Sequence, residues 1–251
     1  MNKAFDIKVA SVSTIVGVIL VLLMSWLTGS NFATPVFPFL AILSAYLISG
    51  MVAGLVSKGE TIAEPGVSSI LTGIITFFVI KSMGLHCFDK LSGEVFNVNM
   101  ILLTLNGIIL TFAGAWAGEK LQGTFEKKSK STEEFIEWGW IMAGTIFGVT
   151  VSIFLSNIII KIFGLNLSPL FISLALGLFV TGWIIGLRSP GVTIKEAGIA
   201  GLLTAVINLD IFKFTLDPET TTLTTLTIFG VLALGMVAAL IGGVAGEKMQ
   251  E

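Results

Sequence analysis

Long apolar stretches recur along the whole chain and are separated by short polar segments. We expect a helix in each of eight stretches, at residues 9–28, 39–57, 62–83, 100–119, 138–160, 170–188, 194–213 and 226–246. About 20 apolar residues in a helix cross the roughly 30 Å hydrocarbon core of a bilayer. The stretches lack the alternation of polar and apolar residues that is typical of a membrane β-barrel. Because backbone groups in lipid must pair within their own segment, the pattern predicts an all-α polytopic membrane protein with eight transmembrane helices.

The composition of the chain agrees with this pattern. Of its 251 residues, 54% are hydrophobic and only 12% are charged, whereas soluble domains carry about 25% charged residues. The net charge of −2 gives no basic field that would attract nucleic acid. The expected surroundings are therefore the lipid bilayer and other membrane-protein subunits, or further copies of the chain in an oligomer.

The basic residues predict how the helices are oriented. One side of the predicted bundle carries ten of the 14 Lys and Arg residues: Lys3, Lys8, Lys58, Lys120, Lys127, Lys128, Lys130, Arg188, Lys195 and Lys248. The other side carries Lys81, Lys90, Lys161 and Lys213. Short cytoplasmic loops hold an excess of Lys and Arg. We therefore expect a multi-pass protein of the cell (inner or plasma) membrane with both termini in the cytoplasm.

Two sequence stretches occur twice. The segment GMVAGLVSKGETIAEPG at 50–66 recurs as GWIIGLRSPGVTIKEAG at 182–198, and GAWAGEKLQ at 114–122 recurs as GGVAGEKMQ at 242–250. This indicates a four-helix repeat at 1–122, a cytoplasmic linker at 123–135 and a second four-helix repeat at 136–251. Four helices return the chain to its starting side, so the repeats are parallel and related by a pseudo-twofold axis along the membrane normal.

The sharpest repeated motif is S-x-G-x-T-I-x-E, which has a structural and a functional interpretation. Its residues are Ser57, Gly59, Thr61 and Glu64, and again Ser189, Gly191, Thr193 and Glu196. The glycine suits the positive φ at the end of a helix, and the threonine and glutamate have capping-box spacing. This predicts a tight cytoplasmic turn between helices. In the functional alternative, Glu64 and Glu196 face each other and bind a cation or carry protons.

Glycines recur at spacings typical of helix contacts in membranes. They are Gly50, Gly54, Gly107, Gly114 and Gly118, and again Gly182, Gly186, Gly235, Gly242 and Gly246. In lipid, small residues let helix backbones approach closely and so supply the packing. We interpret these glycines as helix-packing positions. A narrow glycine-lined pore is the alternative.

The helix interiors hold little that could carry chemistry. Asn106 and Asp210 are the clearest polar residues within the spans, and intramembrane charge is the usual mark of an ion pathway. Glu119 and Glu247, each followed by a lysine, are interpreted as helix ends at the membrane surface.

A metal, cofactor or catalytic site is not expected. His86, Cys87 and Asp89 lie together in an outer loop, but a zinc site needs three or four ligands. The chain has no H-E-x-x-H, G-x-S-x-G or P-loop motif. Polar segments are also too short to fold a catalytic domain, so we do not expect an enzyme.

Two functions of different classes fit this sequence. The first is a non-catalytic scaffold or assembly subunit that packs against partner helices through glycine-rich faces. The second is a transporter or channel for a neutral or lipid-like substrate, with a path between the two repeats. An intramembrane enzyme ranks below both.

Overall fold

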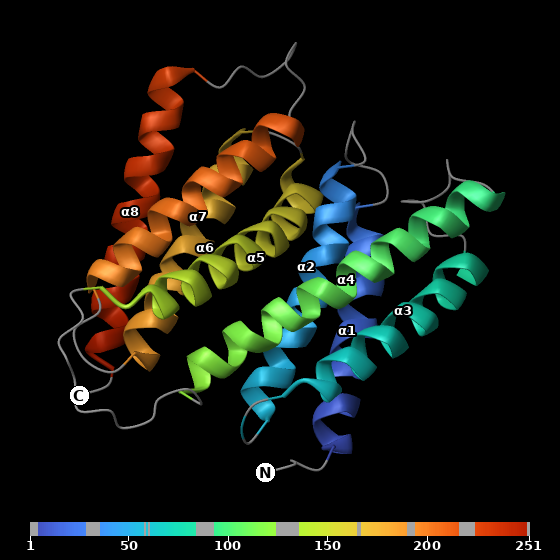
Figure 1. Cartoon of the computed structure of the whole chain (residues 1–251). Coiled ribbons are helices and arrows are strands. Elements are labelled where there is room, and N and C mark those ends of the chain that lie inside the picture. Colours follow the sequence, from blue (N-terminus) through green and yellow to red (C-terminus); the bar gives the residue numbers. More distant parts are fainter. Residues whose placement is uncertain are drawn as a thin grey trace. The chain divides into compact units, whose positions relative to one another are not determined.

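The computed structural model of the protein describes residues 5–28, 36–57, 59, 61–83, 93–123, 136–164, 167–189, 194–215 and 224–249. These residues form eight α-helices (Figure 1): α1 (Ile7–Thr28), α2 (Val36–Val56), α3 (Ala63–Met83), α4 (Gly93–Gln122), α5 (Trp138–Phe163), α6 (Leu167–Arg188), α7 (Ile194–Thr215) and α8 (Thr225–Glu247). The expected all-helical fold is confirmed for this part of the chain.

Among the described residues, seven helices are long and apolar enough to cross a membrane, and α7 is the one that is not among them. The chain is therefore a multi-pass membrane protein by helix length and composition. Helix α7 has 22 residues, as many as α1 and α6, but it holds Glu196 in its first turn and Lys213 in its last turn. Lys195 and Asp210 add two more charges to it.

Proline marks the starts of three helices. Pro38, Pro65 and Pro169 are each the third residue of their helix, in α2, α3 and α6. The first-turn N–H groups have no partner within the helix, so proline loses nothing there. Helix α4 begins at Gly93, earlier than the apolar stretch at 100–119, because its first turns are polar and hydrogen bonding within a helix does not require apolar side chains.

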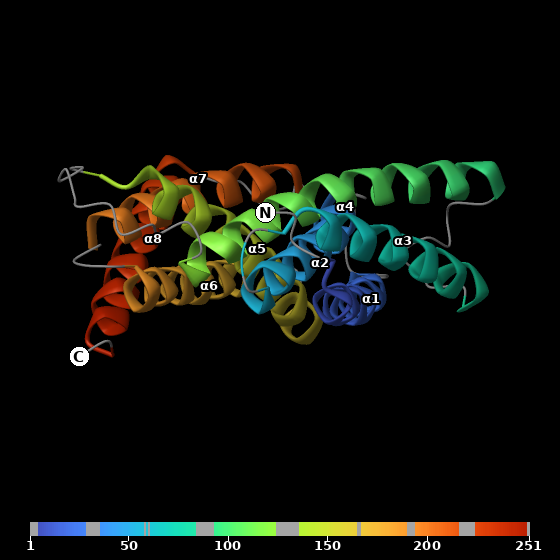
Figure 2. The ribbon, with the colours of Figure 1, turned by 60° about the horizontal axis from the view of Figure 1, so that its bottom comes forward.

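The chain divides into two compact units, Met1–Glu119 and Lys120–Glu251. In the first unit, α1 packs against α2 and α3, as Figures 1 and 2 both show. Helix α4 contacts α3, where the rings of Phe77 and Phe96 lie 5.9 Å apart. It also contacts α2 through glycines, and these contacts position the candidate site.

In the second unit, α6 packs against α5 and α8, and α7 packs against α5 and α8. A buried apolar cluster joins α5, α6 and α7: Ile141, Ile185, Ala197 and Ala200. Small residues on α7 let the three helices meet here, because alanine leaves room for the larger isoleucines.

Candidate functional site

The turn between α2 and α3 is built by the first copy of the repeated motif. Ser57 is fully buried, and its hydroxyl donates to the Gly59 carbonyl at 2.7 Å. Gly59 has a φ of 141°, in the region that glycine adopts without a steric penalty. The positive φ expected for this glycine is therefore present.

The next residue of the motif, Thr61, binds a side chain from a different helix. Its backbone N–H and its hydroxyl both donate to Oε1 of Glu119, near the end of α4. The sequence predicted a capping box in which this N–H binds Glu64, and that detail is wrong. Glu119 reaches Thr61 because α4 packs on α2 at Gly54, where a Cβ would lie 2.7 Å from the Glu119 nitrogen. Glu119 is 4% exposed, so it is a buried structural acceptor rather than only a surface anchor.

Glu64 is also buried, and it reaches the start of α1. Its Oε1 accepts a hydrogen bond from the Asp6 N–H at 3.0 Å. The Asp6 carboxylate in turn caps α1 by accepting from the Lys8 N–H at 2.9 Å. Glu64 lies in the first turn of α3 and binds at the start of α1. Its negative charge therefore suits the positive ends of two helix dipoles.

The second copy of the motif makes a matching contact. Glu196, in the first turn of α7, is 6% exposed, and it accepts from the N–H of Glu137 at 3.2 Å. Glu137 directly precedes α5, as Asp6 directly precedes α1. Ser189 is buried, whereas Gly191 and Thr193 lie outside the described residues. Each glutamate thus binds a backbone N–H of its own unit.

Helices α2 and α4 touch through their backbones. A Cβ at Gly50, Gly54, Gly114 or Gly118 would lie 2.0–2.4 Å from a carbonyl oxygen of the facing helix. Real contacts between carbon and carbonyl oxygen are about 3.3–3.6 Å. Gly107 lies on the same contact, where a Cβ would be 2.7 Å from the Tyr46 ring. Only glycine fits at these positions.

Helices α6 and α8 make the same kind of contact. A Cβ at Gly182, Gly186, Gly242 or Gly246 would lie 1.9–2.2 Å from a facing carbonyl oxygen. At Gly235, a Cβ would be 2.8 Å from Ala205 of α7. All ten glycines singled out in the sequence are buried. They are engaged by contacts within their own unit.

A group of buried hydroxyls joins α1, α2 and α3, and the sequence interpretation missed it. The Ser13 hydroxyl lies 3.0 Å from those of Ser49 and Ser68, and all three residues are fully buried. Thr72 and Thr76 continue the group along α3, and Thr72 Oγ1 has no hydrogen-bond partner among the described residues. The residues at 68, 72 and 76 are four apart and so share one helix face, which was the available signal.

The second unit has its own buried polar group. Gly148 packs against the hydroxyls of Thr181 and Thr204. In the described part of this unit, three other buried polar side chains have an atom without a hydrogen-bond partner: Ser152, Asn157 and Asn208. The space around Gly148 is filled, since a Cβ there would lie 2.6 Å from the Thr204 hydroxyl.

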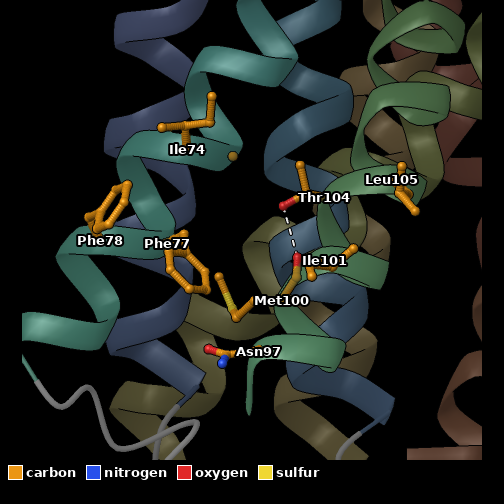
Figure 3. A pocket seen from close by; sticks show the side chains of 9 residues that line it. Ile74, Phe77, Phe78, Asn97, Met100, Ile101, Thr104 and Leu105 are labelled. Atoms are coloured by element: carbon orange, nitrogen blue, oxygen red, sulfur yellow. Dashed lines mark hydrogen bonds between the residues drawn. The ribbon is translucent and has the colours of Figure 1, made fainter. Parts of the chain in front are cut away.

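An open groove of about 470 Å³ lies between α3 and α4 (Figure 3). Its walls are almost entirely apolar, and its lining includes Phe77, Phe78, Met100, Ile101 and Leu105. Two polar side chains contribute to it. The Thr104 hydroxyl donates to the Met100 carbonyl at 2.9 Å, whereas the buried Asn97 Oδ1 has no partner among the described residues.

The two intramembrane polar residues predicted from the sequence both lie exposed. Asn106 of α4 donates through Nδ2 to the carbonyl of Leu102 in the same helix at 2.8 Å. Asp210 lies on α7, five residues before its end. The structure brings neither of them to the turn formed by Ser57, Gly59 and Thr61.

In the described part of the chain, no three His, Cys, Asp or Glu side chains are grouped so that they could hold a metal ion. His86, Cys87 and Asp89 lie outside that part. No family model, no curated protein and no solved structure matches this chain.

Proposed function

We propose that the protein crosses the membrane eight times as two parallel copies of one four-helix unit, with both termini in the cytoplasm. Its proposed role is that of a non-catalytic assembly subunit that packs against partner helices. The contacts within each unit support the architecture, and one exposed amide supports the role.

The repeat is supported by contacts that recur with the sequence offsets. Gly50 faces the Thr111 carbonyl, and Gly182, 132 residues later, faces the Ala239 carbonyl, 128 residues after Thr111. The carbonyls that face Gly114 and Gly118 belong to Leu47 and Met51, and those that face Gly242 and Gly246 belong to Phe179 and Trp183. Each of these positions in the second unit follows its counterpart by the offset of its own helix.

The charges of α7 favour counting it as the eighth span. Lys195 and Glu196 lie in its first turn, and Asp210 and Lys213 lie within its last two turns. The stretch 197–209 between them has no charge and would be about 20 Å long as a helix. Charged side chains near helix ends extend to the membrane surface. Helix α7 also packs against α5 as α3 packs against α1.

The observation that carries the assembly role is Asn106. It lies near the middle of α4 and is exposed among Leu102, Leu105 and Ile109, each more than half exposed. Its amide nitrogen binds its own helix, which leaves the amide oxygen without a printed donor. Hydrocarbon cannot supply one, whereas a neighbouring helix can, and such contacts hold membrane helices together. The ten glycines already serve contacts within each unit, so we expect the partner helix at this face of α4.

The test is the mass of the full-length protein, purified in a mild detergent, by light scattering or native mass spectrometry. We expect a stable complex with another subunit or with further copies. The Asn106→Leu variant should release monomers, because its apolar side chain provides no hydrogen bond. Ile109→Leu, at another exposed position of α4, is the control and should leave the complex intact. A monomeric wild type, or an Asn106→Leu complex as stable as the wild type, would contradict the role.

Transport of a neutral or lipid-like substrate is the second candidate. The buried hydroxyl and amide atoms without partners favour it, because such atoms can bind a neutral polar solute. Proteoliposomes loaded with small uncharged solutes separate the two functions. The assembly role predicts the same flux as in protein-free liposomes, and transport predicts a faster flux.

A further inference from the structure

The groove between α3 and α4 is apolar along its length and polar at one end. Phe77 and Asn97 lie at the polar end, and Leu105 lies farther along α4 (Figure 3). The eight residues from Asn97 to Leu105 rise about 12 Å along the helix. Half of a bilayer core is about 15 Å deep. The groove thus covers most of one leaflet, with its polar end toward the membrane surface.

Charged side chains of both signs leave this polar end. Lys81 lies in the last turn of α3, exposed, with Nζ 5.6 Å from the centre of the Phe77 ring. Glu94 lies in the first turn of α4, also exposed, two residues before Phe96. The contact between the Phe77 and Phe96 rings places these helix ends together. An occupant here therefore meets a cation, an anion and the unpaired acceptor Asn97 Oδ1.

We propose that this groove binds one phospholipid of the phosphatidylethanolamine type. An acyl chain lies along the apolar walls, the phosphate lies beside Lys81, and the primary ammonium donates to Asn97 Oδ1 and faces Glu94. This occupant has an apolar part, an anionic group and a donor in the order in which the groove offers their partners. A plain apolar helix face would leave Asn97 Oδ1 unpaired, which costs about 1–3 kcal/mol.

The site belongs to the first unit alone. At the offsets of the repeat, Asp210 replaces Phe78 of the wall, and Leu232 replaces Thr104. A carboxylate in place of an aromatic ring is a poor surface for an acyl chain, because burying a charge without a partner is costly. Lipid binding therefore distinguishes two units whose glycine contacts are alike.

The experiment uses the full-length protein, delipidated in a mild detergent and mixed with either dioleoyl phosphatidylethanolamine or dioleoyl phosphatidylcholine. Native mass spectrometry then counts the lipids that stay bound. We expect one phosphatidylethanolamine to bind about tenfold more tightly than phosphatidylcholine, because a methylated ammonium cannot donate a hydrogen bond to Asn97. Asn97→Leu should remove this preference while the acyl chain still binds.

Filling the groove tests the site itself. Ile101 is 57% exposed, so Ile101→Trp can fold and should weaken binding of both lipids about tenfold or more. Ile109→Trp is the matched control, since Ile109 is 67% exposed on the same helix and outside the groove lining. Three results would overturn the proposal: equal binding by the wild type and Ile101→Trp, a head-group preference that survives in Asn97→Leu, or no bound lipid with a complex that Ile101→Trp dissociates. The last result would assign the groove to a partner helix. Because Asn106 does not line the groove, failure of lipid binding leaves the assembly role to its own test.

Discussion

The contact between α2 and α4 at Gly50 is the tightest in the first unit, and it allows a quantitative prediction. An added Cβ would lie 2.0 Å from the Thr111 carbonyl oxygen and 2.8–2.9 Å from two further backbone atoms of that residue. A carbon needs about 3.3 Å from a carbonyl oxygen. In Gly50→Ala, the two helices must therefore separate by about 1.3 Å at this point, because the obstacle is backbone and cannot rotate away.

Forcing a group into a filled interior costs about 1–3 kcal/mol. Alanine also stabilises a helix relative to glycine by up to about 1 kcal/mol, so a control must share that gain. Gly230 in α8 provides one, since an added Cβ there meets no atom within 4 Å. The free energy of unfolding of Gly50→Ala should be about 1–3 kcal/mol below that of Gly230→Ala, which is about a 5-fold to 150-fold difference in the equilibrium constant.

The assay is unfolding of the purified protein in mild-detergent micelles by titration with a denaturing detergent, followed by circular dichroism. Gly182→Ala should lose about as much as Gly50→Ala, because its added Cβ would lie 1.9 Å from the Ala239 oxygen. The reasoning is refuted if Gly50→Ala is as stable as Gly230→Ala.

Two further predictions use the same unfolding assay. Thr61→Val should destabilise by about 1–3 kcal/mol, because it removes a hydroxyl donor from the buried Glu119; Thr225→Val, at an exposed position, should change little, and equal losses would argue against the buried hydrogen bond. Glu64→Leu should cost about 1–3 kcal/mol by leaving the Asp6 N–H unpaired, whereas Glu64→Gln keeps an acceptor and should cost less. The same order is expected for the two substitutions of Glu196, and a Gln variant as unstable as the Leu variant would show that the charge, not the acceptor, matters.

The sequence predicted the helices well because long apolar stretches identify membrane helices directly. It also placed the glycines on contact faces. Sequence spacing alone could not identify their partners. The capping-box prediction failed for a related reason. The spacing of Thr61 and Glu64 is local, whereas the acceptor for Thr61 is Glu119, 58 residues away, and only the packing of α4 on α2 brings it there.

The repetition of Glu119 in the GEK of both copies was a usable signal. It was interpreted as a helix end at the membrane surface, and the buried contact with Thr61 adds a reason for a glutamate at that position. The groove could not be predicted, because it depends on how the side chains of two helices diverge. Neither Phe77 nor Ile101 differs in type from the lipid-facing residues around it.

The central claim of this account is that the chain crosses the membrane eight times, so that its ends lie on one side. The most direct measurement is labelling with a membrane-impermeant maleimide in intact cells and in opened membranes. Single cysteines replace Phe5 or Met249, which are 43% and 65% exposed, in a Cys87→Ser background. We predict that both cysteines react only after the membrane is opened, and that Cys87 of the natural chain reacts in intact cells. If Met249→Cys reacts from outside while Phe5→Cys does not, α7 does not cross the membrane and the two-unit account is wrong.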